Sequence, residues 1–193
     1  MNKTSVASAC GWSPLITHAI PSLPPGTLTE KEEQAVMELL DAMRPRPVSV
    51  TIGTSRDTES IRNAHRLAAT WQTRGGTVFD ILDLPEHAAS WLRQARRFTR
   101  ETPDAWIITG RLPGWVQMGR RLALSTEWDP ARTVATASLA HDGLIIHGGI
   151  GTFDHLRGAH RDGRTWEIIR TLRIDRPHTE HTEHTEHTAE EST

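Results

Sequence analysis

The chain has 193 residues, 24% of them charged, and a formal net charge of −2 at pH 7. Such a charge gives no electrostatic reason to expect nucleic acid or a membrane surface as a partner. No apolar run approaches the roughly 20 residues that a bilayer span needs. The single cysteine, Cys10, excludes an internal disulfide. The single cysteine and the lack of a sustained apolar segment of a secretory signal together predict a cytoplasmic protein.

Three segments differ in composition. Residues 1–28 are irregular and end in a breaker cluster of Pro21, Pro24, Pro25 and Gly26. Residues 29–175 have the length of one α/β domain. Residues 176–193 carry a His-Thr-Glu repeat without apolar side chains, which predicts a disordered tail. The repeat lacks the rigidly placed ligands of a structural zinc site, so no metal site is expected. Nothing in the sequence identifies a cofactor.

Helices and short apolar strands alternate along the middle of the chain. Thr29 and Glu32 have the spacing of a capping box, which predicts a helix that ends at Pro45. The pattern then predicts strands over 48–52, 77–82 and 105–109, and helices over about 58–74, 86–100 and 114–126. Short apolar strands joined by helices are typical of a parallel sheet that is covered on both faces.

The last third of the domain is expected to close the sheet with antiparallel strands. Residues 133–140 and 144–147 flank Asp142-Gly143, a two-residue hairpin signal. A short helix over 153–160 follows, and residues 165–174 are expected to form a last strand, with a helix as the alternative. The fold class predicted is α/β, a Rossmann-like three-layer sandwich whose mostly parallel sheet has one antiparallel hairpin at its edge.

Loops at the carboxyl ends of parallel strands are where such sheets bind ligands. The first loop contains Gly53, Thr54, Ser55 and Arg56, in which free amides, hydroxyls and a guanidinium could hold a phosphate. The competing interpretation is ordinary capping of the next helix, with a solvated arginine.

A second loop contains Gly148, Gly149, Gly151 and Thr152, whose amides could approach an anion closely. The alternative is a flexible connector. Trp115 could stack on a base, or it could be a core residue of its helix.

The stretch Asp104-Ala105-Trp106-Ile107-Ile108-Thr109, with Leu112-Pro113-Gly114-Trp115 and Gly119, resembles nucleoside deoxyribosyltransferase-like proteins. In that family a glutamate after the glycine attacks the sugar, whereas Arg120 and Arg121 follow Gly119 here. The loops at Gly53 and Gly148 look like the paired motifs of lonely-guy-type phosphoribohydrolases. Their glycine-threonine precedes a catalytic glutamate, and His155 takes that place here, with Asp154 one position early.

These resemblances imply a protein that binds a nucleotide or a nucleoside phosphate. It would be an N-glycosidic bond hydrolase, or a sensor that has lost that activity, so its status as an enzyme stays open. Asp154, and secondly Asp104, would supply the catalytic carboxylate. The alternative is a non-enzymatic regulatory or interaction protein of a mobile element or accessory gene cluster in a GC-rich bacterium. A homo-oligomer is compatible with either hypothesis.

Overall fold

A computed structural model describes residues 20, 25–88 and 90–177 of the chain. The predictions for the irregular start, for Cys10 and for the repeat over 178–193 fall outside these described residues.

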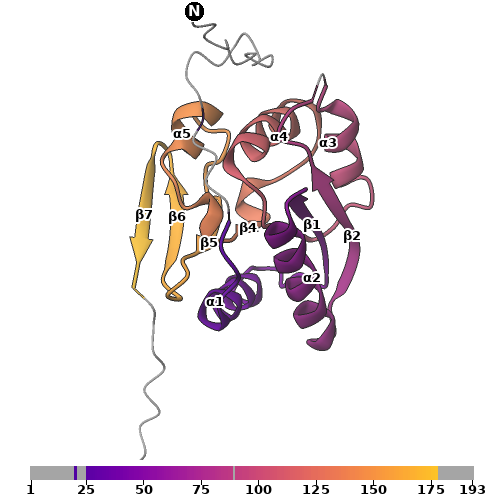
Figure 1. Cartoon of the computed structure of the whole chain (residues 1–193), viewed down its shortest axis with the longest axis vertical. Helices are drawn as coiled ribbons and strands as arrows, with labels where there is room; N and C mark the ends of the chain where they lie inside the picture. Colours follow the sequence, from indigo (N-terminus) through magenta and orange to yellow (C-terminus); the bar gives the residue numbers. More distant parts are fainter. Residues whose placement is uncertain (1–19, 21–24, 89, 178–193) are drawn as a thin grey trace, which may run out of the picture.

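The described chain alternates strands with helices (Figure 1). Its α-helices are α1 (Glu30–Asp41), α2 (Thr58–Thr73), α3 (Leu92–Thr99), α4 (Leu112–Ser125) and α5 (Gly143–Gly148). Its strands are β1 (Ser49–Ser55), β2 (Thr77–Leu84), β3 (Ala105–Ile108), β4 (Thr133–Ala135), β5 (Arg157–Ala159), β6 (Thr165–Ile169) and β7 (Leu172–Arg176). Two single-turn helices, η1 (Pro130–Arg132) and η2 (Ala137–Leu139), flank β4.

One seven-stranded sheet forms the centre of the molecule, in the order β2-β1-β3-β4-β5-β6-β7. The strands from β2 to β5 are parallel, and β6 and β7 are antiparallel to their neighbours. The predicted α/β architecture, with a mostly parallel sheet and an antiparallel hairpin at one edge, is therefore confirmed. The term Rossmann-like is corrected. The order of the parallel strands is 2-1-3-4-5, whereas dinucleotide-binding Rossmann domains have 3-2-1-4-5-6.

Helices cover both faces of the sheet, which gives three layers. Figure 1 shows α1 and α2 on one side and α3, α4 and α5 on the other. Val36 of α1 and Leu67 of α2 pack with Ile107 of the sheet in one core cluster. Trp115 of α4 packs with Ile108 in the cluster on the other face. Among the described residues, no helix combines the length and the apolar character needed to cross a bilayer.

Side-chain caps fix where two helices begin. The hydroxyl of Thr29 accepts a hydrogen bond from the amide of Glu32 at 3.1 Å, which is one half of the predicted capping box. Asp57 caps α2 by accepting a hydrogen bond from the amide of Ser60 at 2.9 Å. Both caps satisfy amides that have no partner inside their helices, and both set the first turn of a helix at the carboxyl edge of the sheet.

Two local predictions are wrong. Asp142-Gly143 forms no hairpin but begins α5, since Leu144 is fully buried in the core and the residues after it wind into a helical turn. The antiparallel hairpin lies instead between β6 and β7, where Arg170 has a positive φ of 59°. The segment predicted as a helix over 153–160 contains β5, because its backbone groups form hydrogen bonds with β4 and β6 instead of within a helix.

Candidate functional site

The carboxyl ends of β1 to β5 meet at one edge of the sheet, where α1, α2 and α4 also have their amino ends. A pocket with a volume of about 270 Å³ opens at this edge. Its lining comes from the chain before α1, from α1 and α2, and from the segments that follow β4 and β5. The lining residues are Pro25, Gly26, Glu32, Asn63, Thr136, Ala137, Ser138, Ala140, His141 and Arg161.

Glu32 is the buried acid of the pocket. It lies in the first turn of α1 with 3% of its surface exposed, and its Oε1 accepts a hydrogen bond from the amide of Ala137 at 2.7 Å. Burial raises the pKa of Glu32 above its usual value, and the amides of Ala137 and Thr29 and the charge of Arg161 offset only part of that increase. The pocket therefore contains a carboxyl group whose ionised form is disfavoured by burial even though the cation Arg161 is nearby.

Arg161 is the cation of the pocket. Its guanidinium occupies the place that a side chain at residue 26 would take, since a Cβ built on Gly26 would lie 1.6 Å from its Nη1. The hydroxyl of Thr29 donates to the carbonyl of Arg161 at 2.6 Å, which ties the segment after β5 to the start of α1. Within the described residues, the guanidinium forms neither a hydrogen bond nor an ion pair, although its positive charge lowers the pKa of Glu32.

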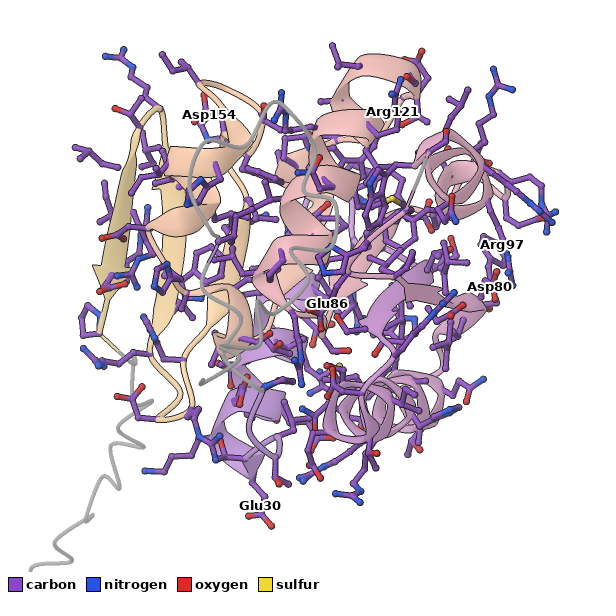
Figure 2. The ribbon with its side chains drawn as sticks, turned by 45° about the horizontal axis from the view of Figure 1, so that its top comes forward. Glu30, Asp80, Glu86, Arg97, Arg121 and Asp154 are labelled. Carbon is purple, nitrogen blue, oxygen red and sulfur yellow. The ribbon has the colours of Figure 1, made fainter. Side chains whose placement is uncertain are left out.

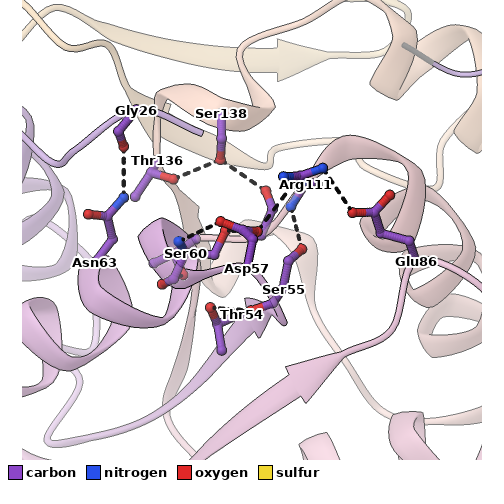
Figure 3. Close-up of polar contacts among 12 residues, drawn as sticks. Gly26, Thr54, Ser55, Asp57, Ser60, Asn63, Glu86, Arg111, Thr136 and Ser138 are labelled. Atoms are coloured by element: carbon purple, nitrogen blue, oxygen red, sulfur yellow. Dashed lines mark hydrogen bonds and ion pairs between the residues drawn. The ribbon is translucent and has the colours of Figure 1, made fainter. Parts of the chain in front are cut away.

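Asn63 of α2 forms a wall of the pocket and fixes the chain that precedes α1. Its Oδ1 accepts from the amide of Leu28 and its Nδ2 donates to the carbonyl of Gly26, both at 3.0 Å (Figure 3). Asn63 is 4% exposed and both ends of its amide have partners. Its role is thus to hold Gly26 beside Arg161 rather than to bind a ligand.

Hydroxyl groups and one imidazole come from the segment after β4. The hydroxyls of Thr136 and Ser138 are 3.0 Å apart, and that of Ser138 donates to the carbonyl of Gly110 at 3.0 Å. Nδ1 of His141 accepts from the amide of Gly143 at 2.9 Å. Because Nδ1 accepts this bond, Nε2 is the ring nitrogen through which exposed His141 can donate a hydrogen bond to a ligand.

A network of charged side chains occupies the point where the strand order reverses, between β1 and β3 (Figure 3). The amide of Arg111 donates to the hydroxyl of Ser55 at 2.7 Å. Its guanidinium pairs with Asp57 and with Glu86, each at 3.2 Å. These contacts connect the loops after β1, β2 and β3. An arginine paired twice with carboxylates has little capacity left for an anionic ligand, so the network stabilises the edge beside the pocket.

None of the residues predicted from the first loop lines the pocket. Gly53 lies inside β1, where an added Cβ would meet Ile108 at 3.0 Å, so close packing explains the glycine. Thr54 and Ser55 are buried at the end of the same strand. Exposed Arg56 pairs with Asp83 at 2.6 Å. Asp57, and not a residue of this segment, caps the next helix.

Trp115 lies in the core and is not among the residues that line the pocket. It is 1% exposed, and its ring contacts those of Phe98, Trp128 and Phe153 at centroid distances of 6.1, 5.8 and 6.3 Å. Its Nε1 has no hydrogen-bond partner in the part of the chain that the structure describes. The position expected to stack on a base is therefore part of an aromatic cluster between α4 and the sheet.

The late glycine loop begins at Gly148, the last residue of α5, and its residues do not line the pocket. A Cβ on Gly148 would lie 2.1 Å from the ring of Phe153, so this glycine makes room for core packing. Gly149 and Gly151 have positive φ values of 93° and 79°, a backbone conformation that favours glycine. The hydroxyl of Thr152 donates to the carbonyl of Gly148 at 2.9 Å and closes the turn.

The two candidate catalytic carboxylates lie at the amino edge of the sheet, opposite the pocket. Oδ2 of Asp104 accepts from the amides of Val48 and Ser49 and from the Ser49 hydroxyl, which joins the starts of β1 and β3. Asp154 accepts from the amide of Arg170 in the β6–β7 turn at 2.6 Å. Figure 2 shows Asp154 beside the antiparallel strands, on the other side of the molecule from Asp80 of β2.

The sequence analysis missed the residues that line the pocket. Glu32 carried a signal as the third helical residue of the capping box, but that signal predicts a cap and not a buried acid. Arg161 carried none, because its place depends on the pairing of β5 with β4 and on the turn of the chain at Gly26. Within the described residues, no group of three or more metal-ligating side chains is arranged to hold a metal ion.

The described chain folds as a doubly wound α/β domain, and this fold is similar to part of several solved ligand-binding proteins. A leucine-binding protein from Thermotoga maritima matches with a TM-score of 0.56 at 18% identity, over 67% of this chain and 36% of that one. An extracellular ligand-binding receptor from Rhodopseudomonas palustris HaA2 gives 0.55 at 18% identity, over 67% and 35%.

A third structure is the solute-binding protein of an ABC transporter from Rhodopseudomonas palustris BisB5, in complex with 3,4-dihydroxybenzoic acid. It matches with a TM-score of 0.52 at 12% identity, over 67% of this chain and 36% of that one. The chain thus spans about a third of the length of these structures, and the likeness shows the fold. No protein-family model and no curated protein matches the sequence.

These structures correct several expectations. The resemblance to nucleoside deoxyribosyltransferase-like proteins and lonely-guy-type phosphoribohydrolases is wrong, because the similar structures are ligand-binding proteins of the kinds named above. The predictions of nucleotide binding and N-glycosidic hydrolysis, which depended on this resemblance, are wrong for the same reason. The expected cytoplasmic location is corrected too, since the similar structures include an extracellular receptor and the binding protein of a transporter.

Proposed function

We propose that the chain binds a small organic carboxylate in the pocket at the carboxyl edge of the sheet. The observation that carries the proposal is Arg161, whose guanidinium lines the pocket and has no hydrogen-bond or ion-pair partner among the described residues. An arginine fork matches the two oxygens of a carboxylate and forms strong, charge-assisted hydrogen bonds with them.

The similar structures support this chemistry. The leucine-binding protein and the complex with 3,4-dihydroxybenzoic acid have different ligands by name, and both ligands carry a carboxylate. The volume of about 270 Å³ suits a molecule of that size rather than a drug-sized ligand.

The other lining groups are chemically complementary to the different parts of such a ligand. Its carboxylate would lie between Arg161 and the Nε2–H of His141, with the hydroxyl of Ser138 nearby. Its apolar part would contact Pro25 and Ala140. An amino group, where the ligand has one, would lie toward Glu32, and its positive charge would offset the cost of ionising that buried acid.

Calorimetric titration of the full chain tests the proposal. L-leucine, 4-methylpentanoate and 3,4-dihydroxybenzoate are compared with 4-methylpentanamide, which keeps the shape of the second ligand and lacks its charge. We expect binding of at least one carboxylate and none of the amide. Arg161→Gln should weaken that binding by about tenfold or more, equivalent to about 1.4 kcal/mol.

Arg164→Gln is the matched control, because Arg164 lies in the same turn between β5 and β6 and pairs with Asp162 outside the pocket. Equal affinities for carboxylate and amide would contradict the proposal. So would an Arg161→Gln variant that binds as tightly as the Arg164→Gln variant.

A further inference from the structure

The last strand of the sheet, β7, has one free edge. It pairs with β6 on one side, and among the described residues no strand pairs with its other side. An unpaired edge offers a row of amide and carbonyl groups to another chain. Two residues on this strand, Leu172 and Ile174, are also exposed apolar side chains, at 67% and 40%.

The hydrogen bonds of β6 show which groups of β7 face outward. Ile168 donates its amide to Leu156 at 2.9 Å and its carbonyl accepts from His155 at 2.7 Å, so its backbone groups point toward β5. Because backbone groups alternate in direction along a strand, Glu167 and Ile169 point toward β7 and pair with Ile174 and Leu172. The amides and carbonyls of the intervening residues, Arg173 and Asp175, therefore point outward.

This outer edge is complementary to itself. An antiparallel pair of β7 strands related by a two-fold axis at Ile174 places Arg173 of each copy opposite Asp175 of the other. The backbone groups of Arg173 and Asp175 both point outward, so the pairing forms four main-chain hydrogen bonds. It also places two pairs of opposite charges directly across the strands from each other. Ile174 then faces its own counterpart, where side chains approach closely.

The side chains of Arg173 and Asp175 already form an ion pair within one chain. Nη1 of Arg173 lies 3.2 Å from Asp175 along the same strand, and the side chain of Asp175 is 43% exposed. Arg173 also pairs with Asp142 at 3.3 Å, and Asp175 with His160 at 3.0 Å. Both side chains can keep these partners when the contact between them is exchanged for the equivalent contact across the axis. The opposite edge of the sheet differs, because β2 carries Asp80 and Asp83 and no basic residue, so two copies of it would bring like charges together.

We propose that β7 is the surface through which two copies of this chain associate, as an antiparallel pair centred on Ile174 that continues the sheet from one copy into the other. Each copy contributes the same surface, as a two-fold interface requires. The proposal does not depend on the ligand of the pocket, which lies at another part of the sheet.

Sedimentation equilibrium of the full chain tests the proposal through exchanged charges. We expect the natural chain to form a dimer, and Arg173→Asp or Asp175→Arg alone to raise its dissociation constant by about tenfold or more, since each creates two like-charge contacts across the axis. The double variant Arg173→Asp/Asp175→Arg restores both contacts and should return the constant to within a few-fold of the natural value. Exchange of Arg100 and Glu101, an exposed pair at the end of α3, is the control and should have no effect.

Amide hydrogen exchange gives a second readout that does not require a variant. Raising the protein concentration should protect the amides of Arg173 and Asp175, while that of Ile174 is already bonded to β6 and should not change. A chain that stays monomeric at its highest soluble concentration would overturn the proposal. A dimer whose dissociation constant does not change in the charge variants would also overturn it. So would a dimer in which the amides newly protected from exchange lie outside β7, including in the segments outside the described residues.

Discussion

The carboxylate of Glu32 accepts a hydrogen bond at 2.7 Å from the amide of Ala137, a residue 105 positions further along the chain. The contact joins the first turn of α1 to the segment that follows β4, so the two sides of the pocket are held together by one buried acid. The side chain of Glu32 therefore both stabilises the fold and lines the pocket. Experiments can separate these two roles.

Glu32→Ala should destabilise the fold by about 1–3 kcal/mol, because it leaves the buried amide of Ala137 without an acceptor. Urea denaturation measures the loss. Glu30→Ala is the control, since Glu30 is exposed in the same turn and its charge acts on the same helix end. If the two variants lose the same stability, the contact with Ala137 contributes nothing beyond the helix dipole.

The pH dependence of Glu32→Gln should reveal the cost of ionising this acid. Burial raises the pKa of Glu32 in the folded state above the value of 4.5, so the folded chain holds the proton more strongly than the unfolded chain. The contribution is fully present below pH 4.5 and is lost as the pH rises through the folded-state pKa. Glu32→Gln, which stays neutral, should therefore gain stability relative to the natural chain as the pH rises above 4.5. A constant difference over that range would contradict the assignment.

Asp104 should show the opposite pH dependence. Burial raises its pKa, but the hydrogen bonds from Ser49 and from the amides of Val48 and Ser49, with the charge of Arg132, outweigh burial and hold the pKa below 3.8. Its stabilising contribution is present above pH 3.8 and is lost as the pH falls through the folded-state value. Asp104→Asn should be less stable by about 1–3 kcal/mol at neutral pH, and the difference should shrink in acid. Unfolding measured across this range decides it, and a difference that grows in acid would be evidence against the clamp between β1 and β3.

The elements that the sequence predicted correctly are those whose signals are local. The cap at Thr29, the apolar spacing of α2 and the short runs of β1 and β3 each determine their own structure. Gly143 shows the limit, because Asp-Gly favours a hairpin turn only when strands on both sides can pair. Here the burial of Leu144 and the packing of Gly143 against Leu112 select a helix instead.

The candidate site was harder to predict than the fold for the same reason. Small residues at Gly53 and Gly148 were interpreted as openings for an anion, whereas neighbouring side chains fill the space beside each of them. The pocket was formed by residues without a local motif. Glu32 and Arg161 are 129 positions apart, and only the parallel pairing of β4 and β5 brings their segments to the same edge.

Trp115 offers a test that separates packing from ligand contact. Trp115→Ala should cost about 3–5 kcal/mol, because it removes a large side chain from an aromatic cluster. Trp115→Phe should cost less, since the indole Nε1 has no partner to lose. Thermal denaturation gives both values. Where Trp115→Phe remains folded, its affinity for the carboxylate should equal that of the natural chain, and a selective loss of binding would instead place the indole at a ligand.

Gly26→Ala should weaken ligand binding while leaving the stability of the fold nearly unchanged. A Cβ at this position would lie 1.6 Å from Nη1 of Arg161, so the guanidinium must move away from its place in the pocket. The end of a flexible side chain moves at little cost, and Gly26 has no positive φ that a larger residue would strain. Calorimetry should show a loss of carboxylate affinity comparable to that of Arg161→Gln, with no further loss in the double variant, because both changes act on the same guanidinium. Additive losses would mean that Gly26 contributes to binding by a route other than Arg161.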